Sequence, residues 1–150
     1  LEWSPERQAL AAALGRHLSD MDGAALLIDY GHGSAKLGDS LQALKSGKPA
    51  NALKAPGRAD ITSHVDFHSF KRAAEVAGAR AWGPIDQGVF LRNLGADARA
   101  AHLKRTATPE AAAEIARGLD RLLHPLAMGS LFKAMALLPA VYPPPAGFEA

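Results

Sequence analysis

The stretch Gly23–Gly33 reads GAALLIDYGHG and decides the fold class of this chain. Its apolar run, Ala24–Tyr30, is short and lacks alternation, which predicts a strand buried on both faces, as in a parallel sheet covered by helices. The run leads directly into a polar loop in which glycines flank a histidine. Ligands of open α/β sheets bind outside the carboxyl ends of strands, so this loop is either a binding site or a tight turn with exposed polar groups. Its candidate site residues are Asp29, Tyr30, Gly31, His32 and Gly33.

Helices and strands are predicted to alternate along the rest of the chain. The predicted helices are Pro5–Leu18, a helix that begins within Asp60–Asp66 and ends at Gly78, Asp86–Leu94, Asp97–Lys104 and Thr108–Leu123; the predicted strands are Ala24–Tyr30, Ala79–Ile85 and Leu131–Leu138. His124–Gly129 is predicted as a turn. This order indicates an α/β protein. Three strands are too few for a complete doubly wound sheet and suggest one half of such a sheet.

The segment Tyr30–Ala59 is rich in glycine and proline and has little periodicity. Within it, Leu41–Leu44 is predicted either as a short strand or as a turn of helix. Connections of this length in a compact domain are usually functional or disordered, so the segment is predicted mainly as a loop.

A second polar cluster reads DITSHVDFH, from Asp60 to His68. Thr62, Ser63 and Asp66 are all residues that favour helix N-caps, so one interpretation is simply a helix start. His64, Asp66 and His68 also raise the hypothesis of a metal site. On a helix only the two histidines would share a face, and the helical interpretation therefore argues against metal binding.

The composition excludes several classes of protein. Of 150 residues, 48% are hydrophobic and 21% charged, which is typical of a globular domain. The absence of cysteine excludes a disulfide scaffold and thiolate chemistry. The net charge of +2 is scattered and only 6% of residues are aromatic, so neither a nucleic-acid partner nor a membrane partner is expected. The first residue is not Met, and we expect a fragment of a longer protein.

Three catalytic motifs are missing from the sequence. Without a G-x-S-x-G elbow, a serine hydrolase is not expected. Without G-x-x-x-x-G-K-[ST] there is no P-loop. Gly31 and Gly33 fit the start of G-x-G-x-x-G, but Lys36 stands where the last glycine is needed. A nucleotide-binding fingerprint is therefore absent from this chain.

Several stretches taken together resemble the MidA family of S-adenosylmethionine-dependent methyltransferases, from about Trp3 to Phe148. They are LLIDYGH (Leu26–His32), GDSLQA (Gly38–Ala43), PGRADITSHVDF (Pro56–Phe67), the residues Gly83, Pro84, Gln87, Gly88, Phe90 and Leu91, and the turn Met128–Lys133. Mitochondrial members of this family methylate an arginine of a respiratory complex I subunit and support assembly of that complex. The resemblance therefore implies S-adenosylmethionine as cofactor and a protein arginine as acceptor.

The resemblance also implies an architecture for residues 1–150. They would be the C-terminal part of a single methyltransferase domain, the C-terminal half of a class I, Rossmann-like seven-stranded sheet. Ala24–Tyr30 would be the fifth strand, and the cofactor-binding glycine motif would lie N-terminal to this chain. We expect the fragment to be inactive by itself and stable only with its N-terminal half. A homodimer stays open, and the expected location is the cytoplasm of a bacterium or the mitochondrial matrix of a eukaryote.

The family comparison assigns roles to the two polar clusters, which we expect to meet at the substrate entrance. Carboxylates can orient a guanidinium by bidentate hydrogen bonds, and the catalytic candidates are Asp29, Asp60 and Asp66. The substrate-binding candidates are Tyr30, Gly31, His32, Thr62 and His64. Two departures from the family are a basic loop without histidine, LKSGKPANALKA, and His68 in place of a small or hydroxyl residue.

Two alternatives to an arginine methyltransferase remain open. One is a non-catalytic assembly or binding factor with a methyltransferase-like fold, which would not bind S-adenosylmethionine. The other is a metal-dependent hydrolase built on His64, Asp66 and His68, which would contain bound metal.

Overall fold

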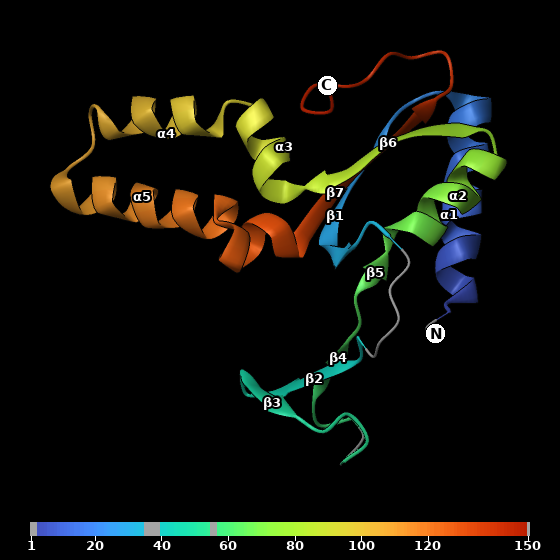
Figure 1. Cartoon of the computed structure of the whole chain (residues 1–150), viewed down its shortest axis with the longest axis horizontal. Coiled ribbons are helices and arrows are strands. Elements are labelled where there is room, and N and C mark those ends of the chain that lie inside the picture. Colours follow the sequence, from blue (N-terminus) through green and yellow to red (C-terminus); the bar gives the residue numbers. More distant parts are fainter. Residues whose placement is uncertain (1–2, 35–39, 55–56, 150) are drawn as a thin grey trace.

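A computed structural model of the chain describes residues 3–34, 40–54 and 57–149. Within them the chain forms a central sheet with helices, a helical hairpin that extends to one side of it, and a small separate sheet that projects below it (Figure 1). The α/β class predicted from the sequence is confirmed. None of the described helices is both long and apolar enough to cross a bilayer.

The central sheet has four strands in the order β5-β1-β7-β6. Their bounds are Val65–Asp66 for β5, Ala25–His32 for β1, Phe132–Pro139 for β7 and Ala79–Asp86 for β6. β7 runs antiparallel to both β1 and β6, whereas β1 and β5 are parallel. The sheet is therefore mixed, and the strand ends of β1, β5 and β6 share one edge with the start of β7.

Burial of β1 differs from the sequence-based expectation. Ala25 and Leu27 pack on the core, but Leu26 and Ile28 on the opposite face are 56% and 43% exposed. In this chain the strand therefore has one covered face, because α1 and α2 cover only that side.

The core lies between the sheet and two helices, α1 (Pro5–Met21) and α2 (Phe67–Val76). Ser4 caps α1 by accepting a hydrogen bond from the Arg7 amide at 3.4 Å, as its sequence position predicts. A Cβ at Gly15 would lie 2.5 Å from the carbonyl oxygen of Ala74, so only glycine lets the two helices approach this closely. The largest fully buried side chains are Phe67, Met135 and Leu137.

The chain between β6 and β7 forms the helical hairpin. α3 (Gln87–Asn93), α4 (Ala96–Lys104) and α5 (Pro109–Leu123) match the predicted helices within two residues. Thr108 caps α5, its Oγ1 lying 3.3 Å from the Ala111 amide. The predicted turn is an irregular helical turn, η1 (Pro125–Gly129), in which Ala127 departs from helical dihedral angles.

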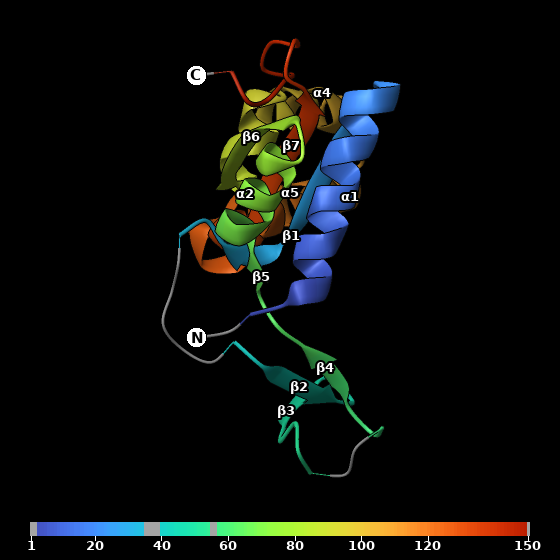
Figure 2. The same ribbon diagram turned by 90° about the vertical axis from the view of Figure 1, so that its right-hand side faces the viewer.

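Two of the three strands of the small projecting sheet lie in the segment predicted as a loop. Its antiparallel strands, in the order β3-β2-β4, are β2 (Gln42–Lys45), β3 (Lys48–Ala50) and β4 (Asp60–Thr62). We call the described residues 40–54 and 57–62 the β2–β4 arm; it extends away from the central sheet (Figure 2). The strand alternative for Leu41–Leu44 is confirmed, and the prediction of a loop for the rest of Tyr30–Ala59 is wrong where β3 forms.

The structure also locates the start of the helix that ends near Gly78. Asp66, one of the three predicted N-cap candidates, caps α2, which begins at Phe67. The residues before this helix form the short strands β4 and β5. The N-cap preferences are satisfied by Asp66 alone. Pairing with residues far away in the chain decides the conformation of the preceding residues, and local preferences do not reveal such pairing.

Candidate functional site

The parallel pairing of β1 with β5 brings the two polar clusters together. Gly31 pairs with Val65, and His32 pairs with Asp66. Because side chains alternate along a strand, Tyr30, His32 and Asp66 share one face of these strands. Gly31 and Val65 point to the other face, toward the core.

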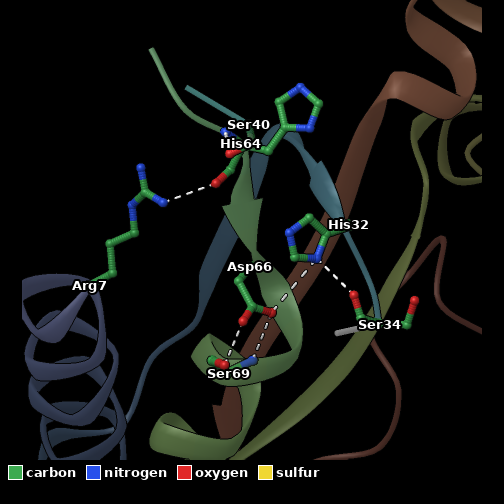
Figure 3. Close-up of polar contacts among 7 residues, drawn as sticks. All are labelled: Arg7, His32, Ser34, Ser40, His64, Asp66 and Ser69. Atoms are coloured by element: carbon green, nitrogen blue, oxygen red, sulfur yellow. Dashed lines mark hydrogen bonds and ion pairs between the residues drawn. The ribbon is translucent and has the colours of Figure 1, made fainter. Parts of the chain in front are cut away.

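His32 is the most enclosed polar side chain of this junction. Its Nδ1 lies 2.8 Å from the carbonyl oxygen of Ser34 and 3.9 Å from Oδ1 of Asp66 (Figure 3). Since a carbonyl oxygen only accepts, Nδ1 carries a hydrogen in this arrangement, and Nε2 is the acceptor of the neutral ring. The side chain is only 14% exposed.

Asp66 is both a helix cap and a partner of the histidine. Its Oδ1 accepts from the Ser69 amide at 3.1 Å and its Oδ2 from the Ser69 hydroxyl at 2.6 Å. Burial acts to raise the pKa of the carboxyl, but the hydrogen bonds from Ser69 and the charge that His32 carries when its ring is protonated more than offset this, and the pKa is lowered. The carboxylate is therefore negatively charged at neutral pH.

An aromatic row continues this face across the strands. The ring of Tyr30 makes edge-to-face contacts with His64 at 5.8 Å and with Phe132 at 5.7 Å between centroids. Such perpendicular contacts fix ring orientation. The row presents aromatic surface beside the His32–Asp66 pair.

Arg7, from α1, holds the chain just before β5. Its guanidinium donates to the Ser63 hydroxyl at 2.6 Å. It also donates to the His64 carbonyl oxygen at 3.0 Å, and the His64 amide donates to Oγ of Ser40 at 3.0 Å (Figure 3). The two ends of the β2–β4 arm are thus tied together and to α1. Arg7 is therefore a positioning residue for His64.

Other predicted site residues lie apart from this junction. Asp60 and Thr62 belong to β4 of the arm, and Asp60 pairs with Leu44 there. Asp29 lies on the core-side face of β1, next to Lys133 in register, and accepts the Tyr30 amide at 2.8 Å. The structure therefore unites Asp66 with Tyr30, His32 and His64, but not with the other two carboxylates.

Gly31 has a structural explanation. A Cβ there would lie 2.3 Å from the carbonyl oxygen of Val65 and 3.0 Å from the ring of Phe67. A Cβ at Gly33 would meet Pro84 at 3.0 Å. Both glycines are packed against the protein's own atoms, so they leave no open cradle for a ligand.

A further polar cluster at this edge of the sheet was not identified from the sequence. Asp86 accepts from Nζ of Lys133 and from the Ser130 hydroxyl, both at 2.7 Å. Burial acts to raise the pKa of Asp86, and these two partners together lower it below its ordinary value. Lys133 also donates to the Ser130 carbonyl at 2.6 Å, so the cluster is internally satisfied.

No pattern in the sequence marks Arg7 as a neighbour of this site. Arg7 lies 57 residues from His64, and its contacts depend on how α1 packs. The part of the chain that the structure describes holds no group of three His, Asp or Glu side chains arranged for a metal ion.

Comparison with known sequences gives a consistent set of similarities. Residues 1–85 match the profile of a family described as S-adenosyl-L-methionine-dependent methyltransferases. The chain is 37% identical over 142 residues to the mitochondrial protein arginine methyltransferase NDUFAF7 homolog of Drosophila melanogaster, covering 94% of this chain and 32% of that protein. It is 36% identical over 140 residues to NDUFAF7 of Rattus norvegicus, covering 93% and 32%. The chain thus spans about a third of the length of these relatives.

Two solved structures from Burkholderia thailandensis, both of members of one superfamily, share the fold. The first, an uncharacterised protein, superposes with a TM-score of 0.82 at 26% identity and covers 94% of this chain and 39% of its own. The second has a TM-score of 0.79 at 28% identity, with 94% and 38% coverage, and is bound to S-adenosyl-homocysteine.

Proposed function

Because the chain belongs to the family of S-adenosyl-L-methionine-dependent methyltransferases, we propose that it is the acceptor-binding part of an enzyme that methylates a protein arginine. Two relatives are named protein arginine methyltransferases. A solved neighbour is bound to S-adenosyl-homocysteine, which S-adenosylmethionine becomes when it gives up its methyl group. These names support the reaction class and the cofactor.

The residues of this chain do not fit the cofactor's main cradle. The sequence lacks the complete glycine fingerprint, and the glycines beside His32 are packed against Val65, Phe67 and Pro84. The cofactor, when bound, supplies the methyl group. We assign its cradle to an N-terminal half of the same domain, and this chain to the acceptor.

The edge of β1 supports such an N-terminal half. Among the described residues, β1 pairs on that side with β5 at Gly31 and His32 only. Leu26 and Ile28 are also exposed on its uncovered face. An unpaired strand edge and bare apolar side chains favour further strands and helices there, as a seven-stranded sheet would provide.

The observation that carries the proposed acceptor site is the pairing of His32 with Asp66 beside the Tyr30–His64 row. Aromatic faces attract a guanidinium, so Tyr30 and His64 would hold the acceptor arginine. An arginine nitrogen that gains a methyl group must lose a proton. Among the described residues Nε2 of His32 has no hydrogen-bond partner, whereas Nδ1 donates to Ser34. Nε2 would therefore accept this proton, and Asp66 would stabilise the resulting imidazolium.

The geometry ranks the three predicted carboxylates. Asp66 shares its face with Tyr30, His32 and His64, which favours it as the carboxylate of the site. Asp29 lies on the other face of β1 and Asp60 on the arm. Their catalytic roles, and those of Gly31 and Thr62 in binding, stay predictions.

The test uses the full-length gene product with His32→Gln and Asp66→Asn. Loss of a general base lowers turnover by roughly 100-fold, so we expect that decrease in methylation of an arginine peptide with S-adenosyl-homocysteine affinity unchanged. Glu114→Gln, an exposed position of α5, is the control. Unchanged turnover in both site variants would sink the acceptor role.

Asp29→Asn and Asp60→Asn complete the series. Because neither carboxylate lies on the face of the Tyr30–His64 row, we expect smaller decreases in turnover than for Asp66→Asn. A larger effect of Asp29→Asn would reverse the ranking of the carboxylates. Methylation is measured with the same peptide.

A second candidate function is a non-catalytic assembly or binding factor with the same fold. A full-length protein that fails to bind S-adenosyl-homocysteine would support it. The relatives named mitochondrial favour the mitochondrial matrix if the source is eukaryotic. The bacterial cytoplasm, a role in complex I assembly and a homodimer remain proposals that follow from the family resemblance.

A further inference from the structure

The β2–β4 arm carries an unusual concentration of positive charge. Its sequence contains Lys45, Lys48, Lys54 and Arg58 but only one carboxylate, Asp60. A cavity of about 170 Å³ opens in the arm, lined by Lys45, Ala50, Asn51, Lys54, Arg58 and Ala59. Three of the four cations therefore line one cavity, with no carboxylate in its wall.

The strand register separates the carboxylate from this cavity. Lys45 pairs with Lys48, and Leu44 pairs with Asp60. Because successive side chains point to opposite faces of a sheet, Lys45 and Lys48 lie on one face while Leu44 and Asp60 lie on the other. Asp60 is thus placed where it does not neutralise the cavity.

The cations of the cavity are also unpaired within the described residues. Among residues 3–34, 40–54 and 57–149, no carboxylate lies within ion-pair distance of Lys45, Lys54 or Arg58. Lys45 and Lys48 even stand directly opposite each other, an arrangement of like charges that destabilises a sheet. An anionic group in the cavity would relieve this repulsion.

The surroundings of the cavity favour a polypeptide over other anions. The arm has no aromatic side chain on which a base could stack, which argues against single-stranded nucleic acid. Ile61 is 53% exposed and lies on the same face as Lys45, because it pairs with Ala43. Leu53, which follows β3, is 85% exposed. Acidic side chains mixed with apolar ones would match such a surface.

We propose that the basic face of the β2–β4 arm docks an acidic segment of the acceptor protein. This inference rests on the proposed function, since it names a feature of the same substrate. β4 runs through Ser63 and His64 into β5, and Arg7 ties this connection to α1. A segment docked on the arm therefore lies at the approach to the Tyr30–His64 row.

The experiment measures binding of two synthetic peptides to the full-length gene product. One is rich in glutamate and carries a single arginine; the other has glutamine in place of each glutamate. We expect the acidic peptide to bind about tenfold more tightly, with a preference that declines as salt screens the charges. Lys45→Glu combined with Arg58→Glu should abolish the preference.

The matched control reverses the same number of charges elsewhere. Arg99→Glu with Lys104→Glu, on the exposed surface of α4, should keep the preference for the acidic peptide. Equal loss in both double variants would show an effect of net charge alone and overturn the proposal. Lys54→Gln, a milder change in the loop, should weaken the preference if the double variant fails to fold.

Two further readouts separate the possible failures. The first is binding to phosphatidylserine–phosphatidylcholine vesicles. If the protein binds these vesicles and the acidic peptide does not displace them, the proposal is overturned in favour of a lipid surface. Failure to bind S-adenosyl-homocysteine would refute the proposed function itself. If the Lys45→Glu/Arg58→Glu variant binds S-adenosyl-homocysteine normally and its KM for the acidic peptide is unchanged, only the proposal that the arm docks an acidic segment is refuted.

Discussion

Arg7 lies outside both polar clusters and yet fixes the position of one of them. Its two hydrogen bonds, to Ser63 and to the His64 carbonyl, are made by a half-buried charged donor. Hydrogen bonds of this kind contribute about 1.5–3 kcal/mol each, so Arg7→Ala, which removes both, should lower the free energy of unfolding by about 3 kcal/mol or more. Denaturant titration measures it.

A functional readout distinguishes positioning from simple stabilisation. In the full-length gene product Arg7→Ala should raise KM for an arginine peptide while leaving S-adenosyl-homocysteine affinity unchanged. Arg16→Ala, an exposed position on the same helix, is the control and should change neither quantity. A normal KM in the Arg7 variant would mean that Arg7 only stabilises the fold.

Single residues also show what the sequence could predict of the site. His32 and Asp66 were both identified, because polar side chains after a buried strand and before an apolar helix face are informative. Gly31 was chosen for its freedom near a ligand, whereas the structure shows that it makes room for Val65. Arg7 was missed, since a contact made by helix packing leaves no local pattern.

At the scale of elements, Asp66 is the N-cap that starts α2. Replacing an Asp N-cap by alanine costs about 0.5–2 kcal/mol, so Asp66→Ala should destabilise the protein by that amount. Asp66→Asn should cost less, because asparagine also caps helices. Ser69→Ala removes only the hydroxyl partner of Oδ2 and should fall between them. Thermal melts of the three variants test this order.

The lowered pKa of Asp66 adds a dependence of stability on pH. The folded state holds this proton less tightly than the unfolded chain, whose Asp pKa is about 3.9. The stabilisation is therefore complete above that value and is lost as pH falls through the lower folded pKa. Asp66→Asn should flatten the acid limb of a stability–pH curve, and an unchanged limb would contradict the assignment.

Elements with local signals were predicted well. The α5 helix has its cap at Thr108, Pro109 in the first turn and a regular apolar stripe, and its observed end at Leu123 is the predicted one. The β2–β4 arm was largely missed, because each of its strands has three or four residues and is defined by partners elsewhere. Such short strands carry no periodicity of their own.

At the scale of the whole molecule, the family resemblance and the α/β class are confirmed. The resemblance covered most of the chain, and in the observed sheet the last strand, β7, lies between β1 and β6. The seven-stranded sheet remains a proposal, since it depends on residues outside this chain. Its physical support is the bare face of β1.

The bare face yields a prediction that needs no assay of activity. Ile28 is 43% exposed in this chain, but an N-terminal half would bury it. In the full-length gene product Ile28→Lys should therefore lower the free energy of unfolding by about 2 kcal/mol or more, the transfer free energy of a buried isoleucine. Val76→Lys, at an 89% exposed position of α2, should be nearly neutral. If Ile28→Lys is equally neutral in denaturant titrations, that face is open to solvent and no further part of the protein covers β1.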